Sequence, residues 1–316
     1  MIYNLLIALA FLGLSSCAVT QWKATRETTE AEAAYPPSGD FLEVGGQRLH
    51  YVEAGSGPPL VLIHGASGNL RDWTFDAVER LSDDYRVIAF DRPGLGYTPP
   101  LGDDGATIFE QAELLSEGAR RLGAERPLVL GQSYGGAVAL AWAVNHPDRI
   151  SALVLLAAAS QTWETDLPTY YKITSGPLGP LANPAISAWA PEGVVQDAIA
   201  EIFAPQPVPE GYATHIGAPL TLRPESIRAN ALQRAGLKEE IRAMVPRYGD
   251  IDVPVEILHG SADTTVGLQI HSVPLDEQIR DARLTVLPGV GHMPQHVAIP
   301  EVDAAIDRAA RRAGLR

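Results

Sequence analysis

Ser133 lies in a residue pattern that can turn a serine into a nucleophile. The motif Gly131-Gln132-Ser133-Tyr134-Gly135 comes directly after the apolar run 128–130 and before the helix-like stretch 137–142. A side chain at a very tight strand-to-helix turn needs residues without a Cβ atom two positions away on either side, and only glycine lacks one. A helix that starts there directs free N–H groups toward the same point. The pattern therefore predicts a reactive hydroxyl at Ser133.

A base and an acid stand where such a serine needs them. A serine hydroxyl is a weak nucleophile unless a base takes its proton, and a carboxylate must orient that base. Asp263 follows the apolar run 255–258, and His292 follows the apolar run 284–287. Loops after parallel strands meet at one sheet edge, and the chain order Ser, Asp, His is typical of this arrangement. We expect Ser133 to attack an acyl carbonyl, His292 to transfer the proton and Asp263 to orient His292, without a metal or organic cofactor.

Two other acids remain as alternatives to Asp263. Glu164 and Asp166 follow the apolar run 153–156, which reads as a strand ending at the same sheet edge. Loop position and chain order favour Asp263 over both of them.

The remaining histidines have structural interpretations. His296 lies four residues after His292, a spacing that on a helix would suggest zinc. Pro294 lies between them, however, and the glutamate of the H-E-x-x-H zinc motif is missing. We interpret three further histidines as residues of strand edges, turns or helix ends: His50, His146 and His259.

A third requirement is a pair of hydrogen-bond donors for the oxyanion that forms during acyl transfer. The glycine-containing loop His64-Gly65-Ala66-Ser67-Gly68 follows the apolar run 60–63. In this arrangement that loop supplies one backbone N–H, and the residue after the nucleophile supplies the other. The predicted donors are the N–H groups of Ala66 and Tyr134. We expect His64 to support the loop by hydrogen bonding and not to transfer protons.

These residues need a parallel sheet to position them, and the apolar runs predict one. Gly45-Gly46 predicts a tight hairpin turn, while Thr107 and Glu110 form a capping-box signature for a helix that ends before Gly123. Helical patterns alternate with the later runs, as in α/β proteins. The expected strands cover residues 41–44, 48–52, 60–63, 86–90, 128–130, 153–156, 255–258 and 284–287. The predicted fold is α/β, a doubly wound and mostly parallel eight-stranded sheet with an inserted helical cap.

The cap is the segment 160–249, which interrupts the core segments 41–159 and 250–316. It is rich in proline and glycine, has helix candidates at 194–203 and 226–235, and contains no convincing buried strand. Six of its aromatic residues could line a pocket over the sheet edge or pack the cap's own small core: Trp163, Tyr170, Tyr171, Trp189, Phe203 and Tyr212.

The N-terminus reads as a targeting segment. Residues 5–14 are an apolar stretch too short to span a bilayer and suited to a signal peptide. Leu14-Ser15-Ser16-Cys17 resembles the lipobox of bacterial lipoproteins, so we expect a signal segment 1–17 whose cleavage leaves a lipidated Cys17. Residues 18–40 are polar and predict a flexible tether. This places the protein in a bacterial cell envelope, anchored to a membrane by lipid. The alternative is a cytoplasmic enzyme with an uncleaved tail.

Composition limits the possible partners. The net charge is −14 and the pI is near 5.0, and no basic stripe is present, which argues against nucleic acid. The apolar content of 46% supports a substantial core. The sequence does not specify the oligomeric state.

The motifs together resemble the α/β-hydrolase superfamily, and specifically its capped, epoxide-hydrolase-like and haloperoxidase-like branch. The resemblance runs from residue 41 to the C-terminus with the exception of the cap. The matching motifs are His64-Gly65, Asp91-Arg92-Pro93-Gly94-x-Gly96, Gly131-x-Ser133-x-Gly135-Gly136, His259-Gly260-x-x-Asp263 and Gly289-x-Gly291-His292. By this resemblance Asp91 and Arg92 belong to a structural loop beside the oxyanion strand.

The nucleophile distinguishes the activities within that branch. Epoxide hydrolases and haloalkane dehalogenases have an aspartate in the position of Ser133, and prolyl iminopeptidases have a tryptophan in that of Tyr134. The resemblance therefore implies a serine hydrolase acting on a carboxylic ester, and the aromatic residues of the cap favour a small or medium apolar acyl group. Alternatives on the same triad are perhydrolysis, acyl transfer, lactone opening and carbon–carbon bond hydrolysis. A low-turnover protein that binds a small molecule is a further alternative.

Overall fold

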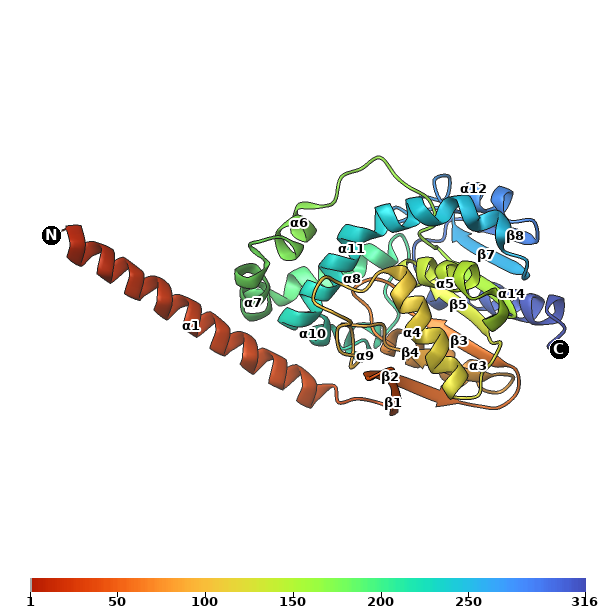
Figure 1. Cartoon of the computed structure of the whole chain (residues 1–316), viewed down its shortest axis with the longest axis horizontal. Coiled ribbons are helices and arrows are strands. Elements are labelled where there is room, and N and C mark those ends of the chain that lie inside the picture. Colours follow the sequence, from red (N-terminus) through yellow and green to blue (C-terminus); the bar gives the residue numbers. More distant parts are fainter. Residues whose placement is uncertain (1) are drawn as a thin grey trace.

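The computed structural model describes the chain from Ile2 to Arg316, with side chains from Ser15 onward. Figure 1 shows one twisted sheet with helices on both faces, a group of helices at one end and a long N-terminal helix beside that group. The sheet has eight strands in the order β1-β2-β4-β3-β5-β6-β7-β8. Their bounds are β1 Asp40–Val44, β2 Gln47–Ala54, β3 Pro59–Ile63, β4 Arg86–Phe90, β5 Leu128–Gln132, β6 Ala152–Leu156, β7 Val255–Gly260 and β8 Ala282–Leu287. The predicted doubly wound sheet is confirmed.

The strands from β3 onward are parallel, and β1 and β2 form an antiparallel hairpin at one edge. The hairpin turn has positive φ at Gly45 and Gly46, +59° and +86°, which glycine adopts without strain. Strands β5 and β6 are buried along their whole length. Continuous apolar runs are therefore covered by helices on both faces. Because β3, β5, β7 and β8 run in one direction, the loops that follow them meet at one sheet edge.

Helices cover the sheet on two sides. One face packs against α4 (Ile108–Arg121) and α5 (Tyr134–Asn145), and the other against α3 (Ala77–Leu81) and α14 (Ile299–Arg312). The predicted capping box of α4 is present, with Thr107 as its N-cap. The remaining core helices are short: α2 (Arg71–Thr74), α12 (Ser272–Gln278) and α13 (Pro294–Val297).

Every secondary-structure element described between residues 160 and 249 is a helix. They are α6 (Thr169–Ser175), α7 (Gly179–Trp189), α8 (Glu192–Phe203), α9 (Tyr212–His215), α10 (Ala218–Thr221), α11 (Pro224–Met244) and the first residues of the 3₁₀ helix η2 (Val245–Asp250). Helix α11 packs against α6 and α7 and is much longer than the helix expected at 226–235. Of the cap aromatics, Phe203 and Tyr212 are buried in a small cluster, whereas Trp189 is 55% exposed.

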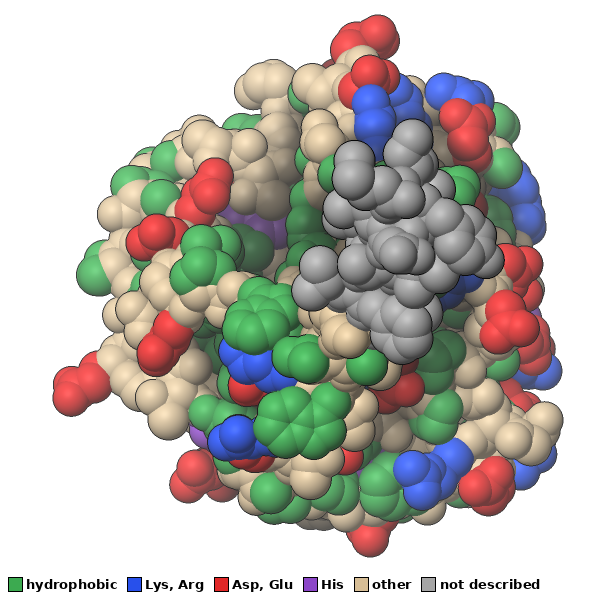
Figure 2. Space-filling view, turned by 90° about the vertical axis from the view of Figure 1, so that its left-hand side faces the viewer, with side chains coloured by type: hydrophobic (Ala, Val, Ile, Leu, Met, Phe, Trp, Pro, Cys, Tyr) green, Lys and Arg blue, Asp and Glu red, His purple; other side chains and the backbone are tan. Residues whose placement is uncertain are grey.

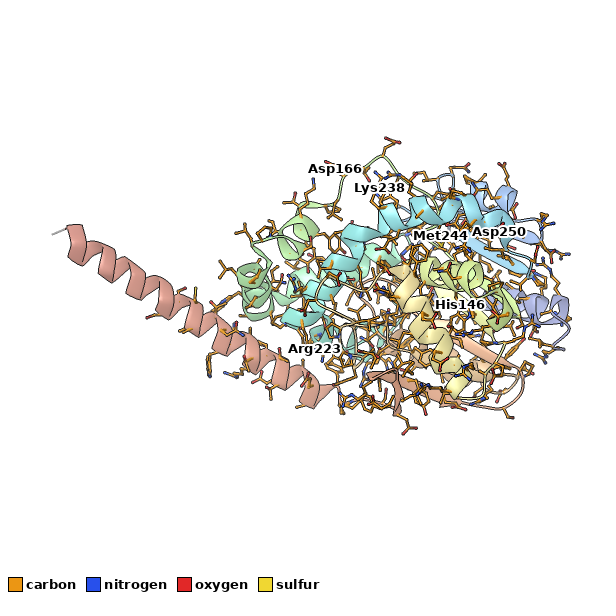
Figure 3. The ribbon with its side chains drawn as sticks, in the orientation of Figure 1. His146, Asp166, Arg223, Lys238, Met244 and Asp250 are labelled. Atoms are coloured by element: carbon orange, nitrogen blue, oxygen red, sulfur yellow. The ribbon has the colours of Figure 1, made fainter. Side chains whose placement is uncertain are left out.

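The segment expected to be a flexible tether is instead helical. Helix α1 spans Ile2–Ala34 and contacts α7 and α10. Ala24 and Ala31, two turns apart, are buried against these helices. Glu32 of α1 pairs at 2.9 Å with Arg223, which is labelled in Figure 3. Small residues on one face let the helices approach closely, and the polar residues of the segment are good helix formers. Tertiary contacts therefore order a segment whose composition alone predicts flexibility.

The apolar stretch 5–14 of the expected signal segment lies outside the residues whose side chains are described. Within the described part of the chain, no helix combines the length and apolar character that crossing a bilayer requires.

Candidate active site

Ser133 occupies a strained turn between β5 and α5. Its backbone has φ +54° and ψ −118°, a conformation that side chains rarely adopt. A Cβ atom added at Gly131 would lie 2.3 Å from the carbonyl oxygen of Gly135, and one added at Gly135 would lie 2.3 Å from that of Ile63. Both positions therefore require glycine. The turn leaves Ser133 partly exposed between buried neighbours, Gln132 and Tyr134.

Asp263 and His292 are in direct contact beside β7 and β8. The Nδ1 atom of His292 lies 2.7 Å from Oδ2 of Asp263, and both side chains are buried. A carboxylate only accepts hydrogen bonds, so Nδ1 is the donor of this pair and the opposite ring nitrogen is the one left to accept a proton. That nitrogen, Nε2, is buried and has no hydrogen-bond partner among the described residues. It is the nitrogen available to act as a general base, and in this structure it makes no hydrogen bond to the Ser133 hydroxyl.

Several donors hold Asp263 as a carboxylate. Its Oδ1 accepts from the backbone N–H groups of Thr265 and Val266 at 2.8 and 2.9 Å. Its Oδ2 lies 3.2 Å from Nε2 of His259, as well as beside His292. Burial alone would raise the pKa of Asp263, but the hydrogen bonds from His259 and His292 outweigh it and hold that pKa well below its usual range. The sequence interpretation of His259 as a turn residue missed this contact.

Gln132 connects the serine turn to two neighbouring loops. Its Nε2 donates to the backbone carbonyl of His292 at 3.0 Å. A Cβ atom added at Gly65 would lie 2.4 Å from its Oε1 and 3.2 Å from Cβ of Ser133. The loop after β3 and the loop after β8 therefore both approach the turn that carries Ser133.

The predicted oxyanion donors have backbone positions suited to that role. Buried Arg92 donates from Nε to the carbonyl of His64 at 2.9 Å and from Nη2 to the carbonyl of Gly65 at 2.8 Å. In a trans peptide the N–H points opposite to the C=O, so the N–H of Ala66 points away from Arg92. Tyr134 is the first residue of α5, where an N–H has no intrahelical acceptor.

His64 uses both ring nitrogens to hold this loop. Its Nδ1 donates to the carbonyl of Gly65 at 2.9 Å, and its Nε2 accepts from the N–H of Arg92 at 3.0 Å. Burial, together with the charge of Arg92, lowers the pKa of His64 to about 4. The imidazole is therefore neutral at physiological pH. Asp91 supports the same region, because its Oδ1 accepts from the N–H of Leu70 and its Oδ2 lies 2.6 Å from Nδ1 of His50.

The cap contacts the predicted oxyanion loop through Ser67. Ser67 has a positive φ of +56°, which a residue with a Cβ atom adopts only when neighbours hold it. Its N–H donates to Oδ1 of Asn230 at 2.9 Å, and its hydroxyl accepts from Nδ2 of Asn230 at 2.9 Å. Thr221 donates to the Ser67 carbonyl at 2.9 Å. No sequence motif identifies Asn230, since its role depends on where α11 packs.

A second cap residue contacts the histidine loop. Gln206 donates to the carbonyl of Gly289 at 2.7 Å and accepts from the N–H of Gly291 at 2.8 Å. The cap therefore binds both loops that flank the serine turn.

The alternative site residues lie in other environments. Asp166 lies on the loop after β6, where its side chain is 93% exposed and 3.3 Å from Nζ of Lys172 (Figure 3). Glu164 on the same loop is also exposed. His146 caps the end of α5 and pairs with Glu113 at 3.1 Å. His296 is buried, with its Nε2 2.8 Å from Oδ1 of Asp72. Cys17 is an exposed free cysteine on α1, and its lipidation stays a prediction.

Comparisons with known proteins agree with the fold. The family described as the alpha/beta hydrolase fold matches residues 58–189. Haloalkane dehalogenase 2 of Mycobacterium tuberculosis is 28% identical over 289 residues, covering 86% of this chain and 94% of its own. An alpha/beta hydrolase fold protein from Burkholderia ambifaria has a TM-score of 0.70 at 25% identity, covering 85% of this chain and 96% of its own.

A thermophilic esterase from Thermogutta terrifontis has a TM-score of 0.69 at 22% identity, covering 87% of this chain and 99% of its own. Its sheet arrangement is shared although its sequence has diverged widely. The eight-stranded sheet, the matched family and these similarities agree with one another. The chain therefore has the α/β-hydrolase fold.

Proposed function

We propose that this hydrolase cleaves carboxylic esters through a covalent acyl-enzyme formed on Ser133. The observation that carries the proposal is the contact between Asp263 and His292, in which Nδ1 lies 2.7 Å from the carboxylate and Nε2 is left without a hydrogen-bond partner among the described residues. A neutral imidazole oriented in this way is the base that a serine hydroxyl requires.

The reaction follows from these groups. As the hydroxyl oxygen of Ser133 attacks the ester carbonyl, its proton moves to Nε2 of His292, and the N–H groups of Ala66 and Tyr134 stabilise the oxyanion. His292 then returns the proton to the departing alcohol. Water attacks the acyl-enzyme with the same proton transfers in reverse order and releases the acid. Asp263 stays ionised throughout and stabilises the transient imidazolium.

The nucleophile also supports an ester substrate over an alkyl halide. An aspartate nucleophile displaces a leaving group from an alkyl carbon, whereas an activated serine is suited to attack on a carbonyl. The relative from Mycobacterium tuberculosis is named a haloalkane dehalogenase, and that class has an aspartate in the position of Ser133. We therefore do not extend dehalogenation to this chain.

We further propose that the substrate has a small apolar acyl group and that the enzyme is attached to a membrane of a bacterial envelope by lipid on Cys17. Cys17 is exposed on α1, as an acylated residue must be. Growth with a labelled fatty acid tests the attachment. Label on the wild-type chain and none on Cys17→Ala is expected, and equal labelling of both would refute it.

The ester activity is tested by Ser133→Ala on a series of p-nitrophenyl esters of increasing acyl length. The substitution should reduce kcat by about 10³-fold or more, because the nucleophile is lost. Ser82→Ala, a matched serine at the end of α3, should keep wild-type activity. Turnover by Ser133→Ala within about tenfold of wild type would refute the assignment. Adding alcohol or peroxide acceptors distinguishes hydrolysis from acyl transfer.

A further inference from the structure

An apolar surface lies where helix α1 packs on the cap. Most large hydrophobic residues exposed in the described chain belong to α1 and to α6–α8. We define the apolar cap face by six of them: Val19 and Trp22 of α1, Ile173 of α6, Leu178, and Leu181 and Trp189 of α7, each 40–64% exposed. Such a cluster of apolar side chains on one surface marks an interaction site.

The chemistry of this face matches a membrane surface. From Ile173 to Pro191 the sequence contains no charged residue. Tryptophans on the face suit the boundary between lipid and water, because their rings combine an apolar body with a polar N–H. Lys23 extends over the ring of Trp189, with Nζ 3.9 Å from the ring centre. Figure 2 shows large apolar side chains, with basic and acidic groups beside them, on the end of the molecule from which α1 extends.

The position of α1 indicates that a lipid bilayer covers the apolar cap face. The indole N–H of Trp189 lies 3.4 Å from the hydroxyl of Thr20, three residues after Cys17. With a rise of about 1.5 Å per residue, Cys17 lies about 5 Å along the helix from Thr20. Either a lipidated Cys17 or the retained apolar stretch 5–14 would therefore hold a bilayer next to the apolar cap face.

We propose that the apolar cap face docks on the lipid bilayer and holds the cap, and with it the active-site loops that the cap contacts, at the membrane surface. The proposal rests on the N-terminal membrane attachment proposed above and is independent of ester chemistry. Its consequence for the enzyme is that apolar acyl substrates dissolved in the membrane reach the site without crossing bulk water. If a second copy of the chain packed on the same face instead, it would shield that face from the lipid.

Tryptophan quenching by brominated phospholipids tests this docking. The full chain is placed in vesicles of phosphatidylethanolamine and phosphatidylglycerol brominated near the headgroup end of the acyl chains. All proteins carry Trp22→Phe, so Trp189 is the exposed tryptophan left on the cap, while Trp73 and Trp142 are buried. Adding Trp189→Phe should reduce the quenched emission about threefold, since interfacial tryptophans contact the lipid. Adding Trp163→Phe, which removes an indole packed against the main core, should not.

A charge variant adds a second measurement. Leu178→Glu with Leu181→Glu should also lower the quenching of Trp189, because carboxylates disfavour contact with acyl chains. The matched control Val286→Glu, at an exposed apolar residue on β8, should leave it unchanged. A chain that does not float with vesicles overturns both the attachment and the docking. A chain that floats with Trp189 unquenched overturns the docking alone, as does a dimer in which Trp189 is hidden from lipid.

Discussion

The side-chain amide of Gln132, the residue before Ser133, donates to the backbone carbonyl of His292 at 3.0 Å. This hydrogen bond joins the turn that carries Ser133 to the loop that carries His292. Because Gln132 also lies against Gly65, one buried side chain connects the turn of Ser133, the loop after β3 and the loop after β8. We infer that Gln132 is a positioning residue whose effect on catalysis is exerted through His292.

Removal of this hydrogen bond should lower kcat and leave KM almost unchanged. In Gln132→Leu the His292 carbonyl loses its donor at a cost of about 1–3 kcal/mol, so kcat should fall about 10-fold to 100-fold while KM changes little. Kinetics with a soluble p-nitrophenyl ester measure this. Gln196→Leu, at an exposed glutamine of α8, is the control. A Gln132→Leu enzyme with wild-type kcat would remove Gln132 from the account.

The proposed role of Asp263 as the acid is tested by comparing it with Glu164 and Asp166. Asp263→Asn keeps the shape of the side chain and removes its charge, so kcat should fall by about 10³-fold or more. Glu164→Gln and Asp166→Asn should retain wild-type kcat, because both side chains are exposed on a different loop. A larger loss in either of these than in Asp263→Asn would reassign the acid.

Asn230 should affect catalysis from the cap. Asn230→Ala leaves the N–H and hydroxyl of Ser67 without their partners, and the neighbouring donor Ala66 loses its fixed position. We expect kcat to fall about tenfold, less than the loss on removing an oxyanion donor outright. Adding Ser67→Gly should restore part of the rate, since glycine adopts a φ of +56° without support.

Arg228→Ala on the same helix, at a more exposed position, controls for general effects on α11. If the Asn230→Ala enzyme is fully active, or if Ser67→Gly worsens it further, the cap does not position the oxyanion loop.

Stability should fall with acidification because two histidines are buried in the neutral form. Burial is the main cause that lowers the pKa of His64 to about 4, and the same holds for His271. The Nδ1 of His271 accepts from the N–H groups of Ser160 and Gln161. A proton on Nδ1 would therefore face two N–H donors and remove both hydrogen bonds. Each unfolded histidine takes up its proton near pH 6.5, which favours the unfolded chain as pH falls from about 6.5 to 4.

The loss should be about 2–3 kcal/mol per histidine across that window, with little change above pH 7. Urea unfolding at pH 7.5 and 4.5 measures it. His271→Asn keeps an acceptor for the two N–H groups and does not titrate, so its stability should depend less steeply on pH. An equally steep dependence in this variant would contradict the explanation.

The sheet could be predicted from sequence because its strands are continuous apolar runs. The run expected at 86–90 coincides with β4, and the runs at 153–156 and 255–258 match β6 and β7 to within two residues at each end. Burial on both faces of a parallel strand demands such runs, so pattern and structure correspond closely.

Features set by tertiary contact could not be predicted in this way. The polar segment after Cys17 lacks a strong apolar face, and its packing on α7 and α10 orders it as a helix. The contacts of Asn230 with Ser67 and of His259 with Asp263 depend on how distant segments meet. A histidine four residues before Asp263 was the one available signal for the second contact, and turns contain such histidines for many other reasons.

Trapping the acyl-enzyme tests the central claim most directly. The chain is mixed with p-nitrophenyl acetate, quenched in acid within a turnover and digested, and the acetylated peptide is sequenced by mass spectrometry. We predict one acetyl group on Ser133, absent from Ser133→Ala and formed far more slowly by His292→Ala. Turnover of the ester with acetyl on another residue, or with Ser133 unmodified under conditions that retain acyl-enzymes, would contradict the mechanism.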